Sequence, residues 1–330
     1  MKILVIGGAG YIGSHTVMEL CDLDNEVVVF DNFSTGFAEN IDKRATIEEG
    51  DILNENDLNN LFSKYNFSFV FHFCALKSAD ESMENPIRYS RNNLIGGINI
   101  INQMLTHKVY NIIFSSSAAV YGKSVYLPMD EKHPLDPLNF YGFTKLEFEN
   151  ILRWYSKISS IKYVSLRYFN AAGYDEKRRI KIPEKNPQNL LPKIMEVVVG
   201  ERKNLEIYGA NYDTKDGTCV RDYIHVTDLA KAHIQSIKYI QNGGRSNVFN
   251  LASGVGYSVL EVVKTVEKLI GRKLPVVFKD RRLGDPEKVI ASTMHKDNPL
   301  DWESRHSDIE NIIQTLLQIY CDPNSSNNKI

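Results

Sequence analysis

A tyrosine and a lysine lie four residues apart in the segment YGFTK, at Tyr141 and Lys145. In a helix this spacing places both side chains on one face. A tyrosine phenolate at neutral pH costs roughly 4 kcal/mol, because the pKa of a free tyrosine is near 10. A lysine cation about 5 Å away returns roughly 3 kcal/mol at an effective dielectric constant of about 20. The pair therefore predicts a tyrosine that works as a general base near pH 7.

A hydroxyl group is expected beside this pair. Residues 111–123, NIIFSSSAAVYGK, begin as an apolar run and change to three serines, as at the end of a buried strand. Ser117 is the last of these serines, and Ala118 and Ala119 follow it. Methyl groups cannot move protons. Ser117 is therefore the candidate hydrogen-bond donor to a reacting oxygen, and no acid or base stands directly after it.

Glycines after the first apolar run indicate a nucleotide cofactor. In GGAGYIG, Gly7, Gly10 and Gly13 lie between KILVI and a helix-like segment. Glycine permits the sharp turn and the close approach of the backbone to a pyrophosphate, and the helix N-terminus supplies N–H groups. Asp31 ends the next apolar run, where a carboxylate accepts hydrogen bonds from a ribose diol and repels a 2′-phosphate. NAD is therefore favoured over NADP.

These residues need strands and helices that bring them together. Short β-branched runs alternate with longer amphipathic segments, which predicts an α/β fold with a Rossmann-type, doubly wound parallel sheet. The expected strands are KILVIG, EVVVFD, FSFVFHF, YNIIFSSS and KYVSLRYFN, and the expected helices span residues 13–21, 55–64, 92–106 and 144–156. Asp51 ends a further strand, where it either accepts from an adenine amine or is a solvated turn residue. Ser307 and Glu310 have the spacing of a capping box before a last helix.

The pattern of the sequence changes after residue 170. EKRRIKIPEKNPQ is polar and contains prolines, as in a loop that leads to a second, smaller region. VRDYIHVTDLAKAH then resumes the strand-to-helix pattern. We expect an NAD-binding domain over residues 1–175, to which the chain returns around residues 222–250, and a smaller mixed α/β substrate domain over residues 176–330.

The composition argues against several classes of function. The 330 residues are 43% hydrophobic and 24% charged with a formal net charge of −2, so no nucleic-acid partner is predicted. No run reaches the roughly 20 apolar residues that span a bilayer, so no membrane partner is predicted and a cytoplasmic location is expected. The four cysteines form no CxxC pair, and no metal site is predicted.

The motifs together resemble a known family. The glycine-rich turn, Ser117 and the Tyr141–Lys145 pair are typical of the extended short-chain dehydrogenase/reductase superfamily. More narrowly, GGAGYIGSHT, DNFSTG, EGDI, SSSAAVYG, RYFNAAG, DGTCVRDYIHVTDLA and RRLGDP resemble the UDP-glucose 4-epimerases, also called UDP-galactose 4-epimerases. The match runs from residue 1 to about residue 317.

The resemblance implies an NAD-dependent isomerase of carbohydrate and galactose metabolism. It would interconvert UDP-galactose and UDP-glucose by oxidation to a 4-keto sugar and non-stereospecific return of the hydride. Tyr141 would take the proton of the sugar 4-hydroxyl, and Ser117 would hydrogen-bond the same oxygen. The resemblance also implies a homodimer joined through the two helices around residues 92–106 and 144–156.

The resemblance assigns further residues where the motifs match. The cofactor site would comprise Gly7, Gly10, Tyr11, Ile12, Gly13, Asp31, Asn32, Asp51, Ile52, Phe73, Lys77, Asn92, Tyr141, Lys145, Tyr168 and Phe169. The UDP-sugar site would comprise Ser117, Tyr141, Asn170, Asn189, Leu190, Tyr208, Arg221, Arg282, Asp285 and Val289. In this second set the two arginines would hold the diphosphate with their planar forks of donors, Asp285 the ribose and Tyr208 the uracil. Taken alone, Arg282 and its neighbour Arg281 are an ordinary exposed basic pair.

Two positions depart from the family pattern, and a third varies within the family. Gln188 stands where many members carry an asparagine, and Ala119 where some carry threonine. Val289, of intermediate size, stands where members vary in bulk and small side chains accompany acceptance of N-acetylated sugars. Activity on UDP-GlcNAc and UDP-GalNAc is therefore an alternative. Another is a related nucleotide-sugar enzyme, a decarboxylase, a reductase or a 4,6-dehydratase, the last of which carries an Asp–Glu pair where Ala118 and Ala119 stand here. An inactive NAD-binding regulator would lack one of the three candidate catalytic residues.

Overall fold

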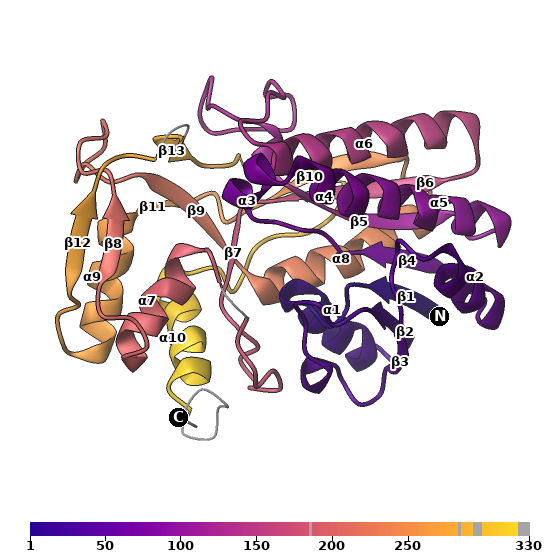
Figure 1. Cartoon of the computed structure of the whole chain (residues 1–330), viewed down its shortest axis with the longest axis horizontal. Coiled ribbons are helices and arrows are strands. Elements are labelled where there is room, and N and C mark those ends of the chain that lie inside the picture. Colours follow the sequence, from indigo (N-terminus) through magenta and orange to yellow (C-terminus); the bar gives the residue numbers. More distant parts are fainter. Residues whose placement is uncertain (185–186, 283–284, 293–298, 323–330) are drawn as a thin grey trace.

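A seven-stranded parallel sheet is the centre of the computed structural model, which describes residues 1–184, 187–282, 285–292 and 299–322 (Figure 1). The strands lie in the order β10–β6–β5–β4–β1–β2–β3, and all neighbours are parallel. They are β1 (Lys2–Ile6), β2 (Glu26–Asp31), β3 (Thr46–Glu49), β4 (Phe69–His72), β5 (Asn111–Ser117), β6 (Lys162–Tyr168) and β10 (Asn247–Leu251). The order reverses between β1 and β4, and ligands bind beyond the carboxyl ends of the strands at such a switch point. The predicted Rossmann-type sheet is confirmed.

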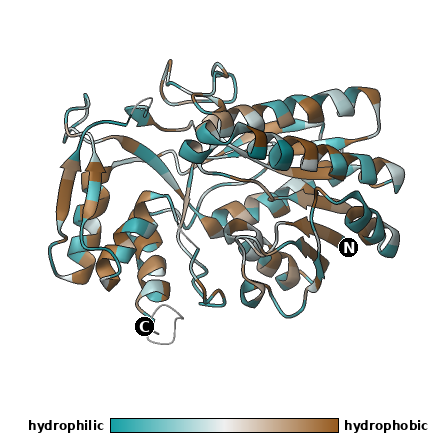
Figure 2. Ribbon diagram, in the orientation of Figure 1, coloured by the Kyte–Doolittle hydropathy of each residue, from teal (hydrophilic) through white to brown (hydrophobic). Residues whose placement is uncertain are grey.

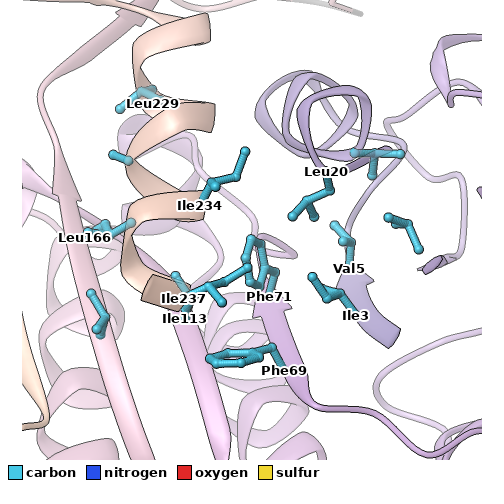
Figure 3. Close-up of a cluster of buried hydrophobic side chains, with 14 of the residues drawn as sticks. Ile3, Val5, Leu20, Phe69, Phe71, Ile113, Leu166, Leu229, Ile234 and Ile237 are labelled. Carbon is cyan, nitrogen blue, oxygen red and sulfur yellow. The ribbon is translucent and has the colours of Figure 1, made fainter. Parts of the chain in front are cut away.

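Helices cover both faces of this sheet, because successive residues of each strand point to opposite sides. α1 (Tyr11–Asp22) and α8 (Val226–Gln241) cover one face. Figure 3 shows the side chains buried there: Ile3, Val5, Leu20, Phe69, Phe71, Ile113, Leu166, Leu229, Ile234 and Ile237. α2 (Glu55–Lys64), α5 (Gly96–Thr106) and α6 (Phe140–Ile158) cover the other face, where Leu4, Ile6, Val70, Ile112, Ile100 and Phe148 are buried. These two cores fix the strand ends that carry the candidate site.

A smaller, mixed region lies on the left of the sheet in Figure 1. β7 (Asn170–Ala172) follows β6 and pairs with β9 (Val220–His225), which also pairs with β11 (Gly256–Ser258) and β13 (Lys288–Val289). β8 (Leu205–Tyr208) and β12 (Val276–Lys279) form a second, parallel pair. α7 (Leu190–Val199), α9 (Val259–Ile270) and α10 (Ile309–Tyr320) share one apolar core in this region. Between β9 and β11 the chain returns to the large sheet through α8 and β10.

Short helical segments lie between several of these elements. α3 (Ala79–Glu84), α4 (Pro86–Tyr89) and the π-helix η2 (Ser90–Ile95) precede α5, while the 3₁₀ turns η1 (Ala38–Asn40) and η3 (Ala118–Val120) follow β2 and β5. The helix expected over residues 144–156 starts earlier, at Phe140, because the Asn139 side chain caps it by accepting from the Gly142 N–H at 2.8 Å. Tyr141 therefore lies in the first turn of α6.

The N-terminus of α10 differs from the sequence prediction. Asp308, and not Ser307, is the capping residue, since its carboxylate accepts from the N–H groups of Glu310 and Asn311 at 2.9 and 3.2 Å. Ser307 instead donates to the buried Asp228 carboxylate at 2.7 Å. The capping-box prediction was wrong because a tertiary partner competes for the serine hydroxyl.

Hydrophobic residues are concentrated in the sheet and on the inner faces of the helices, as Figure 2 shows. Within the described ranges, no helix has both the length and the apolar character needed to cross a bilayer. The same described residues contain no group of three or more His, Cys, Asp or Glu side chains that could hold a metal ion.

Candidate active site

The glycine-rich turn between β1 and α1 forms a cradle made of backbone. Gly7 has a φ of +79°, in the left-handed region that favours glycine. A methyl group on Gly13 would lie 2.2 Å from the Gly7 carbonyl oxygen, so a turn this tight requires glycine there. α1 begins after Gly10, and no described side chain caps its first N–H groups. Uncapped N–H groups at a helix N-terminus are suited to a pyrophosphate, so this turn fits NAD.

Asp31 ends β2 beside this turn. Its two carboxylate oxygens accept from the N–H groups of Ala9 and Phe33, both at 2.9 Å. Burial raises the pKa of Asp31, and the hydrogen bonds from these N–H groups oppose that rise. Each carboxylate oxygen has a second lone pair, so both can still accept from a ribose diol. The Asn32 amide donates to Asp51 at 3.0 Å, which brings the residues predicted on the adenosine side together.

The three candidate catalytic residues meet where the end of β5 approaches the first turns of α6. The Ser117 side chain acts on the Tyr141 hydroxyl to lower its pKa, and the Lys145 ammonium lies 5.9 Å from the centre of the Tyr141 ring. The same ammonium donates to the Ser115 carbonyl oxygen at 2.6 Å and lies 4.8 Å from the centre of the Phe114 ring. The Ser117 and Tyr141 side chains are partly exposed, so a ligand can reach them.

Burial controls protonation in this group. Lys145 is 3% exposed, and burial lowers its pKa from 10.5 to about 7, with Cys74 and Glu149 opposing the change. Burial also raises the pKa of Tyr141, while the hydrogen bond with Ser117 opposes that rise. Desolvation of both groups opposes their favourable charge–charge energy, so the general-base role predicted for Tyr141 also depends on the positive charge that an oxidised nicotinamide would add.

Several side chains predicted at the cofactor site are anchored elsewhere. The Tyr11 hydroxyl donates to the Gly173 carbonyl oxygen at 2.5 Å. The Tyr168 hydroxyl lies 2.5 Å from Nε2 of the buried His233. Four further members have side chains that pack in or against the apolar clusters: Ile12, Ile52, Phe73 and Phe169. The cofactor assignments of these six residues remain proposals.

A neighbouring asparagine was missed from the sequence. Asn93 is 4% exposed; its side chain bonds the N–H and C=O of Leu76 at 2.9 and 3.0 Å and donates to Thr144 Oγ1 at 3.0 Å. It thereby ties the segment before Lys77 to α6. The predicted Asn92 donates to the Asn93 side chain at 3.0 Å. Helical spacing in the sequence could not show which of the two adjacent asparagines is buried, because they lie in the π-helix η2, whose turn differs from that of an α-helix.

The residues predicted to bind UDP converge on one cavity of about 210 Å³. Seven of the predicted substrate residues line it: Asn170, Asn189, Leu190, Tyr208, Arg221, Arg282 and Asp285. Ser117 and Tyr141 lie outside its lining, at the end of β5 and the start of α6. Val289 is also outside the lining; it lies in β13 opposite Arg221 of β9 and packs beside the cluster around Phe169.

Charged and aromatic side chains organise the cavity. Arg221 forms an ion pair with Asp285. The Arg282 guanidinium stacks 4.0 Å from the centre of the Tyr208 ring, and the Tyr208 hydroxyl donates to Glu206 at 2.7 Å. A planar cation over an aromatic ring is held in place without losing its outward donors.

Two further cations of this cavity were missed. Lys193 of α7 and Arg202, which follows that helix, both line it. Burial lowers the pKa of Lys193, and Arg282 and Arg202 lower it further. Lys193 follows Asn189 by four residues, so a helix starting there places both on one face. This spacing is a local signal in the sequence for Lys193. Arg202 offered no comparable local pattern.

Fold and site together define a class of protein. A doubly wound sheet with a glycine-rich turn, an acidic end of β2 and a Ser–Tyr–Lys group at the end of β5 and the start of α6 is typical of nucleotide-cofactor enzymes of the short-chain dehydrogenase/reductase class. Residues 3–252 match the model of the NAD dependent epimerase/dehydratase family. The chain belongs to this family.

Individual relatives cover nearly the whole chain. It is 40% identical over 314 residues to the UDP-glucose 4-epimerase of Halalkalibacterium halodurans, covering 95% of this chain and 94% of that protein. The solved UDP-glucose 4-epimerase of Brucella ovis in complex with NAD has a TM-score of 0.92 and 39% identity, and covers 95% and 96% of the two chains. That of Bifidobacterium longum in complex with NAD+ and UDP has a TM-score of 0.91 and 38% identity, and covers 98% and 100%. The predicted resemblance to UDP-glucose 4-epimerases is confirmed.

Proposed function

We propose that this chain is an NAD-dependent isomerase that interconverts UDP-galactose and UDP-glucose, a reaction of galactose metabolism. The observation that carries the proposal is the placement of Ser117, at the end of β5, beside Tyr141 and the buried Lys145 of α6, with Ala118 and Ala119 directly after the serine. This arrangement offers one acid/base group for one sugar oxygen. It offers no second pair that would move protons elsewhere on the sugar.

Each candidate catalytic residue has a distinct role. Tyr141 takes the proton of the sugar 4-hydroxyl and later returns it, since it is the titratable group that meets Ser117. Ser117 hydrogen-bonds the same oxygen, and the Lys145 cation favours the phenolate form of Tyr141. NAD, when bound, supplies the acceptor and donor of the C4 hydride and a positive charge that opposes the desolvation of that phenolate.

The cavity supports binding of the UDP moiety. Arg221 and Arg282 are placed in it from β9 and from the segment after β12, and each presents a planar fork of donors suited to a diphosphate. Asp285 would accept from the ribose hydroxyls while Arg221 holds its carboxylate. The Tyr208 ring is the platform for uracil, with Arg282 against it.

Product analysis separates this function from the nearest alternative. A 4,6-dehydratase converts its nucleotide sugar to a product lighter by one water, whereas an epimerase leaves the mass unchanged. We expect incubation with UDP-galactose to give UDP-glucose of unchanged mass, resolved by chromatography and mass spectrometry. Loss of water from the sugar would overturn the proposal. The same assay with UDP-GlcNAc tests the broader specificity for which Val289 was considered, and absence of UDP-GalNAc at high enzyme concentration would remove it.

We further propose that the chain works as a homodimer. Four exposed apolar side chains lie on η2 and α6, away from the sheet: Ile95, Phe143, Trp154 and Ile158, with 48%, 41%, 59% and 74% of their surface exposed. Burying such a stripe against a second copy is favourable at roughly 25 cal/mol per Å². Light scattering should give twice the 37.6 kDa mass of one chain, and a monomeric mass would contradict this proposal.

We also propose a domain division and a cellular location for this protein. We propose a division into an NAD-binding domain over residues 1–175 with residues 222–250, and a UDP-sugar-binding domain over the rest of residues 176–330. The placement of α8 and β10 on the large sheet supports it. We also propose a cytoplasmic location, which fractionation of the source cells would test.

A further inference from the structure

The end of β5 contacts a third turn of α6 that the proposed chemistry does not use. Three consecutive serines end this strand, and the contacts of two of them with Tyr141 and Lys145 are described above. The remaining one, Ser116, donates from its hydroxyl to Oε1 of Glu149 at 2.5 Å. Glu149 follows Lys145 by four residues, so the two side chains lie on the same helix face.

Glu149 is a buried carboxylate in a fully hydrogen-bonded group. Arg167 of β6 donates from Nε to Oε1 at 3.0 Å and from Nη2 to Oε2 at 2.6 Å. The Arg167 side chain is only 4% exposed and that of Glu149 only 6%. Nη1 of Arg167 donates to the Tyr121 hydroxyl at 2.9 Å, which donates to Asn250 Oδ1 at 2.6 Å. Buried ion pairs are often no more stable than apolar residues of similar volume. Stability alone therefore gives no reason for this pair.

The Glu149 carboxylate acts electrostatically on Lys145. Burial disfavours its charge, and Glu149 acts in the opposite direction. Its other titratable neighbours are uncharged at neutral pH, because burial raises the pKa of Cys74 to about 12 and lowers the pKa of His72 to about 3. Glu149 is thus the anion that favours the lysine cation among these described neighbours.

Further titratable groups lie on α6 and on the elements packed against it. On α3, α4 and η2 they are Asp80, Glu81, Glu84, Arg88, Tyr89 and Arg91; on β6 they are Lys162, Tyr163, Arg167 and Tyr168; on α6 itself they are Tyr141, Glu147, Arg153, Tyr155 and Lys157. Of these, Arg167 is the charge in direct contact with Glu149.

We propose that Glu149 is a positioning residue for Lys145: its buried carboxylate keeps the lysine cationic beside Tyr141, and Arg167 sets how strongly it does so. This inference rests on the proposed function for its role in catalysis, whereas the electrostatic relation rests on the one-turn spacing of Lys145 and Glu149 in α6, the burial of both side chains and the Arg167–Glu149 ion pair. Glu149 touches neither substrate nor cofactor in this proposal and acts only through Lys145.

The proposal predicts effects of opposite sign. Glu149→Gln removes the anion and leaves the Arg167 cation, so Lys145 loses its proton at lower pH than in the unsubstituted protein. Arg167→Met leaves the carboxylate unbalanced, so Lys145 keeps its proton to higher pH. The double substitution removes both charges, and because Glu149 is the one that acts on the lysine, it lowers the pKa of Lys145 less than Glu149→Gln does. Residues four apart on a helix are neighbours on its surface, and Arg167 balances part of the Glu149 charge, so we expect the pKa of Lys145 to change by about one unit.

Two readouts test this order on the full chain saturated with NAD. NMR titration of ¹³Cε-labelled lysine gives the pKa of Lys145 directly, with its signal identified by its loss in Lys145→Met. The pH dependence of kcat with UDP-galactose should show the same order in its alkaline limb, with KM changed by less than about twofold because the UDP cavity is untouched. Glu147→Gln, two residues away on the same helix, is the matched control and should leave both readouts unchanged.

Each outcome bears on the proposal. The proposal is supported if the pKa of Lys145 is highest in Arg167→Met, lower in the unsubstituted protein, lower again in the double variant and lowest in Glu149→Gln. The proposal is overturned if the pKa of Lys145 is the same in all four proteins, or if both single substitutions change it in the same direction. Glu149 and Arg167 would then be a purely structural ion pair. If Glu149→Gln does not fold, the double variant still has to titrate below the unsubstituted protein. If the unsubstituted protein does not interconvert the two UDP-sugars, the proposed function fails while the NMR titration still decides the relation of Glu149 to Lys145.

Discussion

Replacing Tyr141 by phenylalanine removes a single hydroxyl group and tests whether that group transfers a proton. If the hydroxyl only exchanged a hydrogen bond with Ser117, its loss would cost about 1 kcal/mol, or about fivefold in rate. If it carries the proton of the 4-hydroxyl, the loss should be about 10²- to 10⁴-fold, which corresponds to about 3–5 kcal/mol. We expect the larger effect on kcat, because Tyr141 is the titratable group that Ser117 contacts.

The assay follows conversion of UDP-galactose to UDP-glucose by chromatography, with kcat and KM measured separately. KM should change little, since the cavity that would hold UDP does not include Tyr141 in its lining. The free energy of unfolding should change by no more than about 1 kcal/mol, because one hydroxyl of a partly exposed side chain is removed and no cavity is created. Tyr239→Phe is the matched control; its hydroxyl donates to the Arg245 carbonyl oxygen at 2.9 Å at the far end of α8.

A clear result would refute this reasoning. If Tyr141→Phe stays folded and retains NAD, and kcat falls by less than about tenfold, the hydroxyl is not the proton carrier. The general base would then have to be another group, and the assignment of Ser117 and Lys145 around it would lose its basis.

Three further predictions concern the cofactor turn, the UDP cavity and acid stability. Gly13→Ala should abolish retention of NAD, because its methyl group would lie 2.2 Å from the Gly7 carbonyl oxygen; release of NAD from the denatured protein, read by absorbance, measures this, and full retention would contradict the tight turn. Arg282→Ala should raise KM for UDP-galactose by about 10- to 100-fold with kcat nearly constant, since a charged hydrogen bond contributes about 1.5–3 kcal/mol; unchanged KM in steady-state kinetics would exclude a diphosphate contact. The free energy of unfolding, measured with urea between pH 7 and 4, should fall as the pH drops below 6.5, because burial lowers the pKa of four histidines to between about 3 and about 4 and the unfolded chain then binds more protons: His15, His72, His225 and His233. Burial raises the pKa of Asp222 from 3.8 to about 6, so this one carboxyl opposes the loss of stability over part of the pH range. One carboxyl cannot offset four histidines, and a free energy of unfolding independent of pH would therefore mean that the histidines are protonated in the folded state.

Local patterns in the sequence were sufficient for the elements that carry the site. The alternation of β-branched runs and amphipathic segments predicted the parallel sheet, because strands buried on both faces cannot be polar. The glycine spacing predicted the cofactor turn, since Gly7 and Gly13 occupy positions that a side chain cannot share with the neighbouring backbone. Boundaries were less well predicted: the capping side chain of Asn139 extends α6, and Asp308 replaces the expected cap of α10.

The UDP cavity shows where family motifs go beyond local pattern. The resemblance supplied Arg221 of β9 and, from one segment after β12, Arg282 and Asp285, which meet Arg221 only in the folded chain. It gave no signal for Lys193 or Arg202, which line the same cavity. A basic residue in an amphipathic helix is usually solvated, so its place in a cavity depends on how the helix packs.

The sequence by itself determined the chemistry that is available: a tyrosine and a lysine one turn apart, a serine at a strand end and alanines after it. Those relations are local, because helix and strand periodicity fixes which neighbours share a face. The tertiary structure decided the electrostatics of that chemistry. Lys145 is desolvated by the sheet it packs against, and the carboxylate of Glu149, one turn further along α6, is held by Arg167 from strand β6. Burial and long-range pairing exist only after the chain has folded, and they set the pKa values on which the reaction depends.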